Sequence, residues 1–352
     1  MNYKTKTLVI LTPGFAKDES DSTCLPMQQS LIRCMNKMFP HLNIIILAFQ
    51  YPYVKKIYKW HGNTVISFNG RNRGGLSKLI LFQKWNTAIK KNHRENKIDG
   101  LLSFWYTECA FAGKRFADKY NVTHYCWMWG QDAKKGNKYV SLARLRSDEL
   151  IAFSDFMQDE FKKNYGIKPL HVITPGIDIN EFSFNNVKKD IDVIAAGSLI
   201  PLKQYDVFIQ VVAYLKISMP LIKAVLIGGG PEKNRLQDLI ESAGLQSNIT
   251  MTGELSHPDV LQWMQRGKIF LHPSSYEGFG IVCIEALCSG AEVISFVKPM
   301  HTKIENWHIA TTKEEMILKA TEILATSKDE YKSIILYRIE QTVEKMAQLF
   351  SF

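Results

Sequence analysis

The sequence lacks paired cysteines and long apolar runs, and both absences limit where the protein works. Its six cysteines form no Cys-x-x-Cys pair and mostly lie inside apolar stretches, as is typical of reduced thiols in a cytoplasmic protein. The apolar run from Leu8 to Leu11 is too short for a signal-peptide core. No apolar stretch approaches the roughly 20 residues that cross a bilayer. We therefore expect a cytoplasmic protein whose only membrane contact would be peripheral, on the inner face of the cell membrane.

Two further motifs are missing. Gly228-Gly229-Gly230 lacks the third glycine of Gly-x-Gly-x-x-Gly, and Gly14 stands alone after the first strand-like run, so no dinucleotide-binding fingerprint is present. The one Asp-x-Asp triplet, Asp190-Ile191-Asp192, lies at the start of an expected strand, where an exposed edge explains it. We expect neither a cofactor nor an essential metal.

Strand-like and helix-like segments alternate along most of the chain. This alternation indicates an α/β fold with parallel sheets, and eleven strands suit two Rossmann-like halves better than one sheet. A chain of 352 residues with 46% hydrophobic content is long enough for two cores. Glycine, proline and polar residues gather between Gly166 and Pro175, and we divide the chain into residues 1–167 and 168–334. The expected strands are residues 8–12, 44–49, 64–68, 100–104, 123–127, 150–153, 192–196, 224–227, 249–252, 269–272 and 292–296.

Two glutamates flank an apolar stretch between Pro273 and Gly290. Residues 269–272 resemble a short buried strand and residues 281–288 a helix that Gly290 ends, so Glu277 and Gly278 lie on the turn between them. In open α/β sheets, ligands bind beyond the carboxyl ends of strands, and the N–H groups of a first helical turn suit an anion. This segment is the strongest candidate for a functional site.

The second glutamate, Glu285, lies among apolar neighbours that predict a helix buried over most of its circumference. A buried carboxylate needs partners. In a purely structural interpretation, Glu277 is a surface acid near a helix N-terminus and Glu285 pairs with a lysine of the same protein. In a functional interpretation, Glu285 accepts hydrogen bonds from neighbouring ribose hydroxyls and Glu277 holds a sugar.

The two acids, with seven residues between them, resemble the donor-site signature of retaining glycosyltransferases of family 4, which have the GT-B fold. The likeness includes Gly-Phe-Gly after Glu277 and Glu-Ala-Leu-x-x-Gly from Glu285. Three other segments agree with this family in order and spacing, and the likeness covers residues 174–296 well but the N-terminal half only loosely. They are the loop at residues 196–203, the glycine-proline turn at residues 227–232 and the loop at residues 252–255.

The resemblance implies two Rossmann-like domains whose parallel sheets face each other across a cleft. The N-terminal domain would bind the acceptor, and the C-terminal domain would bind a nucleotide-diphosphate sugar as co-substrate. A C-terminal helix, residues 335–352, would pack back on the N-terminal domain.

The resemblance also implies roles for individual residues. Glu277 would position the donor sugar, Lys203 would offset the charge of the leaving diphosphate, and Glu285 would hold the ribose. The leaving phosphate would take the acceptor proton on the same face, which retains the anomeric configuration. The remaining implied donor-binding residues are Gly14, Gly197, Ser198, Gly229, Gly253, Glu254, Leu255, Gly278, Phe279 and Gly280.

The chain departs from the family pattern at two positions, and the glycine-rich, acidic patch that many members have after the second glutamate is not recognisable in residues 298–307. Ser198 stands where many members have an arginine, so one of two usual diphosphate cations is absent there. Trp129 stands where a histidine commonly faces the reacting sugar, which leaves Trp129, Gln131 and Asp132 as candidates for contact with the sugar or acceptor.

The N-terminal half carries the whole positive excess of a chain with net charge +10. Between Lys55 and Lys97, 11 lysines and arginines are interleaved with apolar residues such as Trp60, Leu79 and Trp85. A basic amphipathic segment suits a surface of anionic lipid, whereas the simpler interpretation is a solvated helical face with an ordinary core stripe. Both interpretations remain open.

From the resemblance we expect transfer of a hexose-type sugar from a UDP- or GDP-sugar to a hydroxyl of a saccharide or lipid-linked saccharide, in cell-surface polysaccharide or lipopolysaccharide synthesis. A DNA-modifying glucosyltransferase and an inactive sugar-nucleotide-binding relative are the alternatives. The basic and aromatic residues form no recognisable nucleic-acid module, so we do not expect nucleic acid as a partner.

Overall fold

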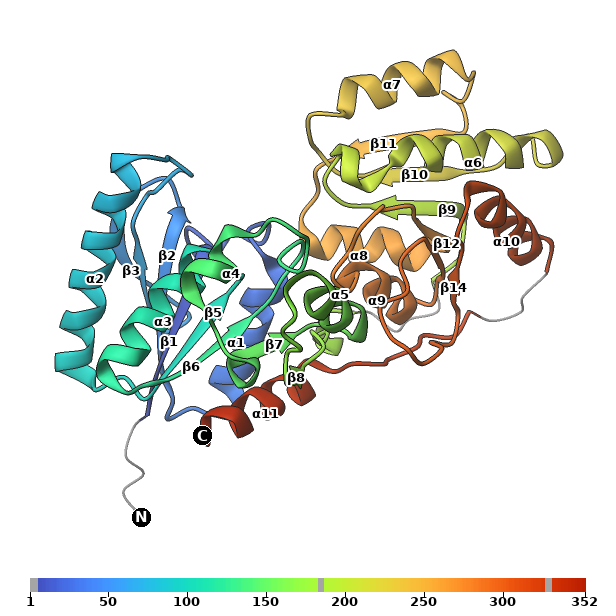
Figure 1. The fold of residues 1–352 in the computed structure, drawn as a ribbon. Helices are drawn as coiled ribbons and strands as arrows, with labels where there is room; N and C mark the ends of the chain where they lie inside the picture. The colour runs from blue at the N-terminus through green and yellow to red at the C-terminus, as the bar shows by residue number, and fades with distance from the viewer. Residues whose placement is uncertain (1–5, 183–186, 327–330) are drawn as a thin grey trace. The chain divides into compact units, whose positions relative to one another are not determined.

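The computed structural model describes residues 6–182, 187–326 and 331–352, and the chain divides into two compact units (Figure 1). The first unit comprises Met1–Gly176 with Ile339–Phe352, and the second comprises Ile177–Arg338. The division falls after Gly176 rather than after Ile167, because β8 (His171–Val172) still pairs with β7 (Leu150–Ala152) in the sheet of the first unit. No helix of the described residues is both long and apolar enough to cross a membrane.

The first unit is built on an eight-stranded sheet of order β3-β4-β2-β1-β5-β6-β7-β8. Neighbouring strands are parallel except β3 and β4, which form an antiparallel hairpin. The remaining strands are β1 (Thr7–Gly14), β2 (Asn43–Tyr51), β3 (Lys56–Trp60), β4 (Asn63–Ser67), β5 (Gly100–Phe104) and β6 (Thr123–Trp127). The helices are α1 (Pro26–Met38), α2 (Leu76–Asn96), α3 (Glu108–Tyr120), α4 (Lys138–Ala143), the 3-10 turn η1 (Ser147–Glu149), α5 (Asp155–Tyr165) and α11 (Ile339–Phe350).

Helices cover both faces of this sheet because successive strand residues point to opposite sides. Val9 and Leu11 pack with residues of α2 and α3, including Trp85 and Phe116, in one buried cluster. On the other face, a Cβ atom placed on Gly100 would lie 2.6 Å from the ring of Phe350, so only a glycine lets α11 approach this closely.

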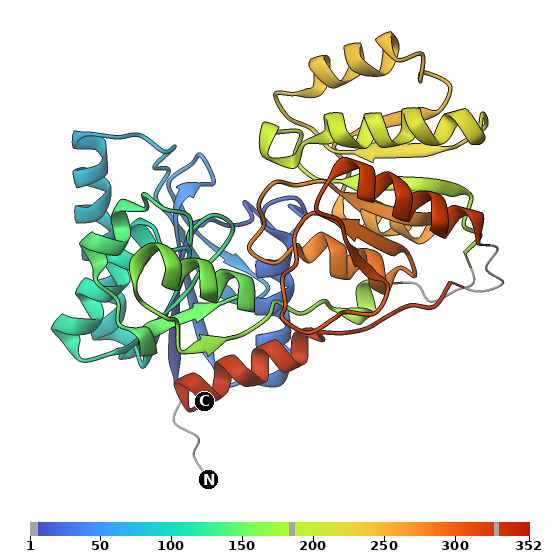
Figure 2. The same cartoon turned by 45° about the vertical axis from the view of Figure 1, so that its right-hand side comes forward.

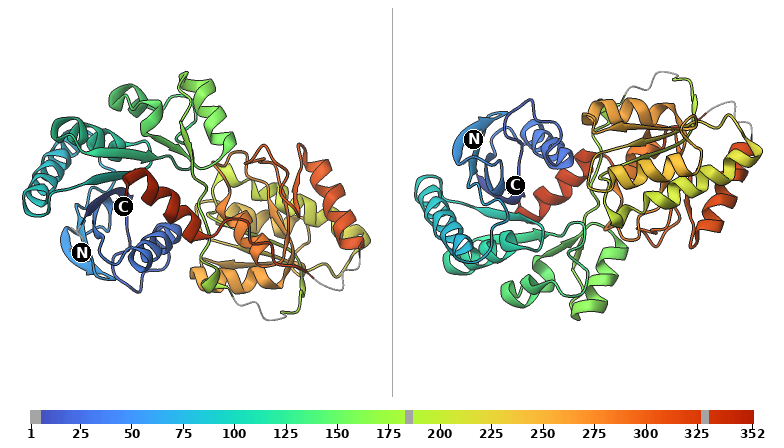
Figure 3. Two further views of the ribbon diagram at one scale, coloured as in Figure 1. Left: turned by 90° about the horizontal axis from the view of Figure 1, so that it is seen from below. Right: turned by 90° about the horizontal axis from the view of Figure 1, so that it is seen from above.

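The C-terminal helix α11 completes the first unit from the far end of the chain. It lies beside α1 (Figures 2 and 3), and Thr342 Oγ1 donates to the carbonyl oxygen of Thr174 over 2.9 Å. The ring of Phe350 packs edge-on against Tyr125, with centroids 5.1 Å apart. The helix begins at Ile339 rather than at residue 335, since residues 331–338 run without helix.

The second unit has a six-stranded sheet of order β11-β10-β9-β12-β13-β14, in which every neighbouring pair is parallel. Helices α6 and α10 pack on one face, and α8 and α9 contact strands from the other. The strands are β9 (Ile191–Ala196), β10 (Ala224–Ile227), β11 (Ile249–Gly253), β12 (Gly267–His272), β13 (Glu292–Ser295) and β14 (Trp307–Ile309). The helices are η2 (Ile179–Glu181), η3 (Pro201–Lys203), α6 (Tyr205–Ser218), α7 (Lys233–Ser242), α8 (His257–Arg266), α9 (Ile281–Cys288) and α10 (Lys313–Ala325).

All eleven expected strands overlap a strand of the structure, but the sequence interpretation missed β3, β8 and β14. β3 reverses into β4 through His61 and Gly62, whose φ angles of 42° and 82° are those of a tight two-residue hairpin turn. The segment between Lys55 and Lys97 is therefore not one amphipathic element: it forms this hairpin, a connection and α2.

The strand order of the second sheet creates one place suited to a ligand. From β9 the chain adds β10 and β11 towards one edge of the sheet, and from β12 it adds β13 and β14 towards the other edge. β9 and β12 are neighbours in the middle of the sheet. At such a switch point the loops after the two strands diverge and leave a crevice at the carboxyl edge. The loop after β9 carries Lys203, and the loop after β12 carries Glu277.

The packing of α11 predicts a measurable cost of removing its anchor. Phe350→Ala should destabilise the first unit by about 3 to 5 kcal/mol, because a buried aromatic ring is replaced by a cavity. Chemical denaturation of the full chain, followed by a probe in the first unit, measures this loss. Gln348→Ala, at an exposed position of the same helix, is the control and should change the unfolding midpoint little. Equal effects of the two substitutions would contradict the packing role.

Candidate functional site

The segment that the sequence marked as the strongest candidate forms the predicted strand, turn and helix. β12 ends at His272, residues 273–280 make the turn, and α9 begins at Ile281. Gly280 caps this helix with a φ of 87°, a conformation that side chains other than glycine seldom adopt. Most residues of α9 are buried, as predicted.

Glu277 and Lys203, 74 residues apart in the chain, meet at the switch point. Lys203 Nζ donates a hydrogen bond to Glu277 Oε1, and both side chains are largely buried. Burial disfavours the ionised carboxylate, but the adjoining imidazole of His272 and the charge of Lys203 outweigh it and lower the pKa of Glu277 to about 2. The site therefore holds an ionised carboxylate and an ammonium group side by side.

His272 is a component of this cluster that sequence reasoning missed. It is the last residue of β12 and is almost fully buried, with Nε2 3.3 Å from Glu277 Oε1. Burial lowers its pKa below the usual value, so the ring is neutral at pH 7. The signal available in the sequence was a histidine at the carboxyl end of a buried strand, two residues before the serines of the turn.

Glu285 has a histidine as partner, not the lysine of the structural interpretation. His257, the first residue of α8, donates from Nε2 to Glu285 Oε1 over 2.8 Å. Its Nδ1 lies 3.4 Å from Glu181 Oε2. Burial disfavours the charged ring, but the hydrogen bonds to Glu181 and Glu285 outweigh it and raise the pKa of His257 to about 10. An imidazolium therefore stands between two carboxylates at neutral pH.

Three glycine loops meet at the carboxyl edge of β9, β10 and β11. Gly197 N donates to Ile227 O over 3.0 Å, and Gly228 N donates to Gly253 O over 2.9 Å. A Cβ atom on Gly228 would lie 1.9 Å from the carbonyl oxygen of Gly197, and the φ of Gly228 is 146°. The backbones of these loops touch, so only glycine fits at Gly228.

The other residues expected to bind the donor fall into two groups. Gly229, Glu254 and Leu255 lie with Gly197 and Gly253 at this loop cluster, where a Cβ on Gly229 would be 3.5 Å from Glu254 Cβ. Ser198 and Glu254 are exposed. Phe279 is instead buried against the rings of Trp307 and Tyr337, so its side chain supports the turn while Gly278 and Gly280 shape its backbone.

A buried phenol adjoins the first of these loops. A Cβ on Gly197 would lie 2.8 Å from Tyr205 Oη, and this oxygen is buried without a hydrogen-bond partner among the described residues. Its burial raises the pKa of Tyr205 well above the usual value, so it stays protonated and able to donate. Tyr205 was not among the residues singled out from the sequence.

Two of the candidates in the first unit, Asp132 and Trp129, make structural contacts, and the expected contacts of Trp129, Gln131 and Asp132 with sugar or acceptor stay predictions. Asp132 Oδ2 accepts from Tyr106 N over 2.6 Å and from Trp129 N over 2.9 Å. Burial raises the pKa of Asp132 to about 7, although the N–H groups of Trp129 and Tyr106 oppose this. Trp129 is mostly buried among aromatic rings, whereas Gln131 is exposed. Gly14 ends β1 with ordinary space around it, and its expected approach to a diphosphate stays a prediction.

The Asp-x-Asp triplet does not mark the exposed edge that we expected, because its carboxylates are half-buried at the start of β9, a central strand, and both are paired. Asp190 makes two hydrogen bonds of 2.8 Å with Arg266, and Asp192 accepts from Lys268 over 2.7 Å. Both carboxylates thus tie the start of β9 to residues at the junction of α8 and β12.

The second unit matches a known family model. Residues 177–335 match the family model described as glycosyl transferases group 1, which corresponds closely to the second unit, Ile177–Arg338. The match contains Lys203, His257, Glu277 and Glu285.

Curated relatives match parts of the chain. A Schizosaccharomyces pombe phosphatidylinositol N-acetylglucosaminyltransferase gpi3 subunit is 34% identical over 31% of this chain and 24% of its own length. An uncharacterized glycosyltransferase of Methanocaldococcus jannaschii is 25% identical over 63% of this chain and 61% of its own. A D-inositol 3-phosphate glycosyltransferase of Paenarthrobacter aurescens is 28% identical over 42% and 40%. The chain thus matches less than two thirds of each of these relatives.

Solved structures match the whole chain. A glycosyltransferase from Rickettsia africae has a TM-score of 0.76 at 15% identity, with 98% of both chains covered. The Anabaena protein HepE, solved with UDP and glucose, has a TM-score of 0.70 at 19% identity, with 97% of this chain and 99% of its own covered. At these identities the likeness concerns the fold, and it confirms the expected GT-B class.

The position of His257 predicts a pH dependence of stability. The pKa of about 10 in the folded protein lies above the ordinary histidine pKa of 6.5, so the contribution of His257 to stability is complete below about pH 6.5 and is lost as the pH rises through 10. His257→Gln should therefore lower the melting temperature most near pH 6, and the gap from the unsubstituted protein should close towards pH 10. Thermal unfolding across this range measures it. A gap independent of pH would contradict the charged pairing, and His301→Gln, at an exposed histidine, is the control.

Proposed function

We propose that the protein, whose second unit matches the family model of glycosyl transferases group 1, is a retaining glycosyltransferase that moves a hexose-type sugar from a nucleotide-diphosphate donor to a hydroxyl of a saccharide or lipid-linked saccharide. The observation that supports this most is the pair of Lys203 and ionised Glu277 at the switch point of the second sheet. A lysine there suits a diphosphate, and a carboxylate there suits the hydroxyls of a sugar.

The proposed mechanism needs no carboxylate nucleophile. As the bond from the anomeric carbon to the diphosphate breaks, negative charge grows on the leaving oxygen, and Lys203 with the N–H groups at the start of α9 offsets it. Glu277 accepts hydrogen bonds from the donor sugar and holds it in place. The leaving phosphate oxygen takes the proton of the acceptor hydroxyl on the same face, so the anomeric configuration is retained.

Tyr205 supplies a hydrogen-bond donor where the chain lacks the common arginine. Ser198 occupies that arginine's position, and the unpartnered hydroxyl of Tyr205 lies behind the adjacent Gly197. In this proposal the phenol supports the diphosphate loop and no metal ion is required. Lys203 supports the metal-free form of the reaction, because its ammonium group supplies positive charge for the diphosphate.

Glu285 receives the ribose in this proposal. His257 occupies Oε1 with one hydrogen bond, and the carboxylate retains lone pairs for two neighbouring hydroxyls. A UDP-sugar is the favoured donor, because the structurally similar Anabaena protein was solved with UDP and glucose, and a GDP-sugar is the second candidate. We place the reaction in cell-surface polysaccharide or lipopolysaccharide synthesis.

The role of Glu277 predicts a specific kinetic defect. Glu277→Gln should lower kcat about a hundredfold and change the donor KM much less, because its contact tightens as the sugar flattens in the transition state. Lys203→Ala should impair both, since the diphosphate is bound before and during reaction. Steady-state kinetics with the donor varied separates the two. Glu241→Gln, an exposed acid on α7, is the control, and equal losses in kcat and KM for Glu277→Gln would contradict its role.

The role of Glu285 predicts that stabilisation of the fold by a nucleotide depends on this carboxylate. A nucleoside diphosphate at 100 times its dissociation constant should add about 2.7 kcal/mol to stability. A thermal-shift series with UDP, GDP, ADP and CMP, each with and without EDTA, should show one stabilising nucleotide whose effect is lost in Glu285→Ala and unchanged by EDTA. Loss of the shift with EDTA would contradict the metal-free proposal, and no shift with any nucleotide would favour an inactive relative.

A further inference from the structure

A groove in the first unit, remote in sequence from the proposed donor site, combines an apolar floor with a positive rim. It lies between α2 and α3, which run side by side in Figure 1, and α4 closes one end. Its volume is about 660 Å³, and all of its lining residues belong to the first unit. From Gly75 to Lys90 it follows α2 for about 22 Å, at 1.5 Å per helical residue.

Aromatic rings form the floor. Phe82 of α2 meets Phe111 of α3 edge to face, with centroids 5.4 Å apart. Further along α3, Phe116 stacks on Tyr120 at 4.5 Å. These rings pack on each other and present apolar surface along the groove.

Every charged residue that lines the groove is a cation. Lys78 is partly neutralised, because its Nζ bonds to Tyr139 and lies 3.5 Å from Glu108 Oε2. The other four spread along both sides, and no acidic residue lines the groove. They are Lys90 on α2, Arg115 and Lys119 on α3, and Lys138 on α4.

Large aliphatic side chains stand exposed at the α4 end of this groove. Leu76, Leu79 and Ile80 in the first turns of α2 are 78%, 62% and 49% exposed, and Leu142 of α4 is 54% exposed. Leu79 and Leu142 both line the groove. Aliphatic side chains of this size gathered beside cations mark an interaction surface rather than an ordinary solvated face.

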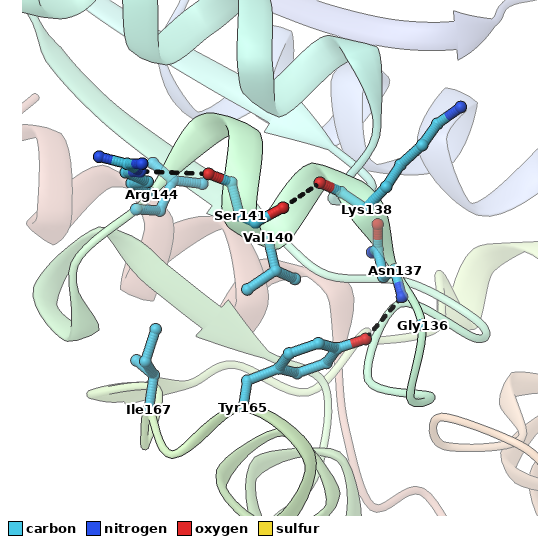
Figure 4. A pocket seen from close by; sticks show the side chains of 9 residues that line it. Gly136, Asn137, Lys138, Val140, Ser141, Arg144, Tyr165 and Ile167 are labelled. Carbon is cyan, nitrogen blue, oxygen red and sulfur yellow. Dashed lines mark hydrogen bonds between the residues drawn. The ribbon is translucent and has the colours of Figure 1, made fainter.

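A neighbouring hollow on the other side of α4 has a different character. It measures about 540 Å³, and its polar groups bond to one another (Figure 4). Asn137 N donates to Tyr165 Oη over 2.8 Å, and Arg144 Nε donates to Ser141 O over 3.2 Å. Lys138 extends away from Tyr165 in this view and also lines the α2–α3 groove, so Arg144 is the one cation that belongs to this hollow alone among its lining residues.

We propose that the α2–α3 groove and the exposed leucines beside it bind an anionic phospholipid leaflet. Leu76, Leu79, Ile80 and Leu142 enter the acyl boundary, and Lys90, Lys119 and Lys138 meet lipid phosphates. This replaces the broader expectation for the segment between Lys55 and Lys97 with a surface made from three helices. Nucleic acid fits less well, because the projecting side chains are aliphatic and the aromatic rings that would stack on bases form the floor.

Vesicle binding by the full chain tests this proposal without any substrate. Pelleting with phosphatidylcholine vesicles is compared with pelleting with vesicles that also contain an equal part of phosphatidylglycerol. The protein should partition onto the anionic vesicles only. Lys90→Gln with Lys119→Gln should lower the partition constant about 25-fold, about fivefold for each lysine. Leu79→Ser with Leu142→Ser should also weaken binding, whereas added salt should weaken the wild type more than the lysine variant.

Matched substitutions in the second unit provide the controls. Lys223→Gln with Lys319→Gln and Ile217→Ser with Leu221→Ser remove the same charge and the same kind of exposed apolar residue, and both should bind as the wild type does. Glu285→Ala should bind vesicles normally even if it loses the nucleotide, which separates this proposal from the proposed function. Equal weakening by the control pairs, binding to no vesicle, or tighter binding to a plain DNA fragment than to anionic vesicles would overturn the proposal.

Discussion

A carboxylate that is buried yet ionised needs a cation beside it, and in this protein that requirement joins two loops of the second sheet. Glu277 follows β12, and Lys203 follows β9, the neighbouring strand. Backbone and side-chain bonds reinforce the junction, since Ser275 N donates to Leu202 O over 3.0 Å and Ser274 Oγ donates to the same oxygen over 3.3 Å. An incoming anion therefore meets a lysine whose position is already fixed but whose charge is shared with Glu277. In the proposed function, this one pair couples binding of the diphosphate to positioning of the sugar.

The two ends of the proposed donor site differ in charge. Lys203 and Glu277 together are neutral, with the N–H groups at the start of α9 adding positive potential. Around Glu285, one imidazolium lies between two carboxylates and leaves a net negative charge. A phosphate is favoured at the first place and disfavoured at the second, where hydroxyl groups that donate hydrogen bonds are preferred. The charges alone thus orient a ligand that has a phosphate at one end and a diol at the other.

The sequence predicted those parts of the site that depend on local pattern. The strand before Glu277, the turn and the buried helix of Glu285 follow from a short apolar run, glycines and a second apolar run, all within about twenty residues. The partner His257 was missed because its contact with Glu285 depends on the packing of α8 against α9. His272 lies in the same segment as Glu277, but the sequence does not show that the turn folds the carboxylate back towards the ring. β8 and β14 were missed for a similar reason: two or three residues carry no periodicity, and they are strands only because β7 and β13 offer free edges. The cations around the α2–α3 groove could not be predicted from the sequence either, because they come from three helices whose packing the sequence pattern does not show.

Because α11 belongs to the first unit, the order of synthesis decides when that unit can complete its core. The second unit is one continuous stretch, Ile177–Arg338, whereas the first unit needs α11, whose residues are synthesised after all of the second unit. Until then the face of the first sheet around Gly100 and the apolar side of α1 lack the cover that Val343, Met346 and Phe350 provide. Domains generally fold as units as they leave the ribosome, N-terminal first. Here the N-terminal unit is the last to complete its core, because its sheet face around Gly100 stays uncovered until α11 has been synthesised.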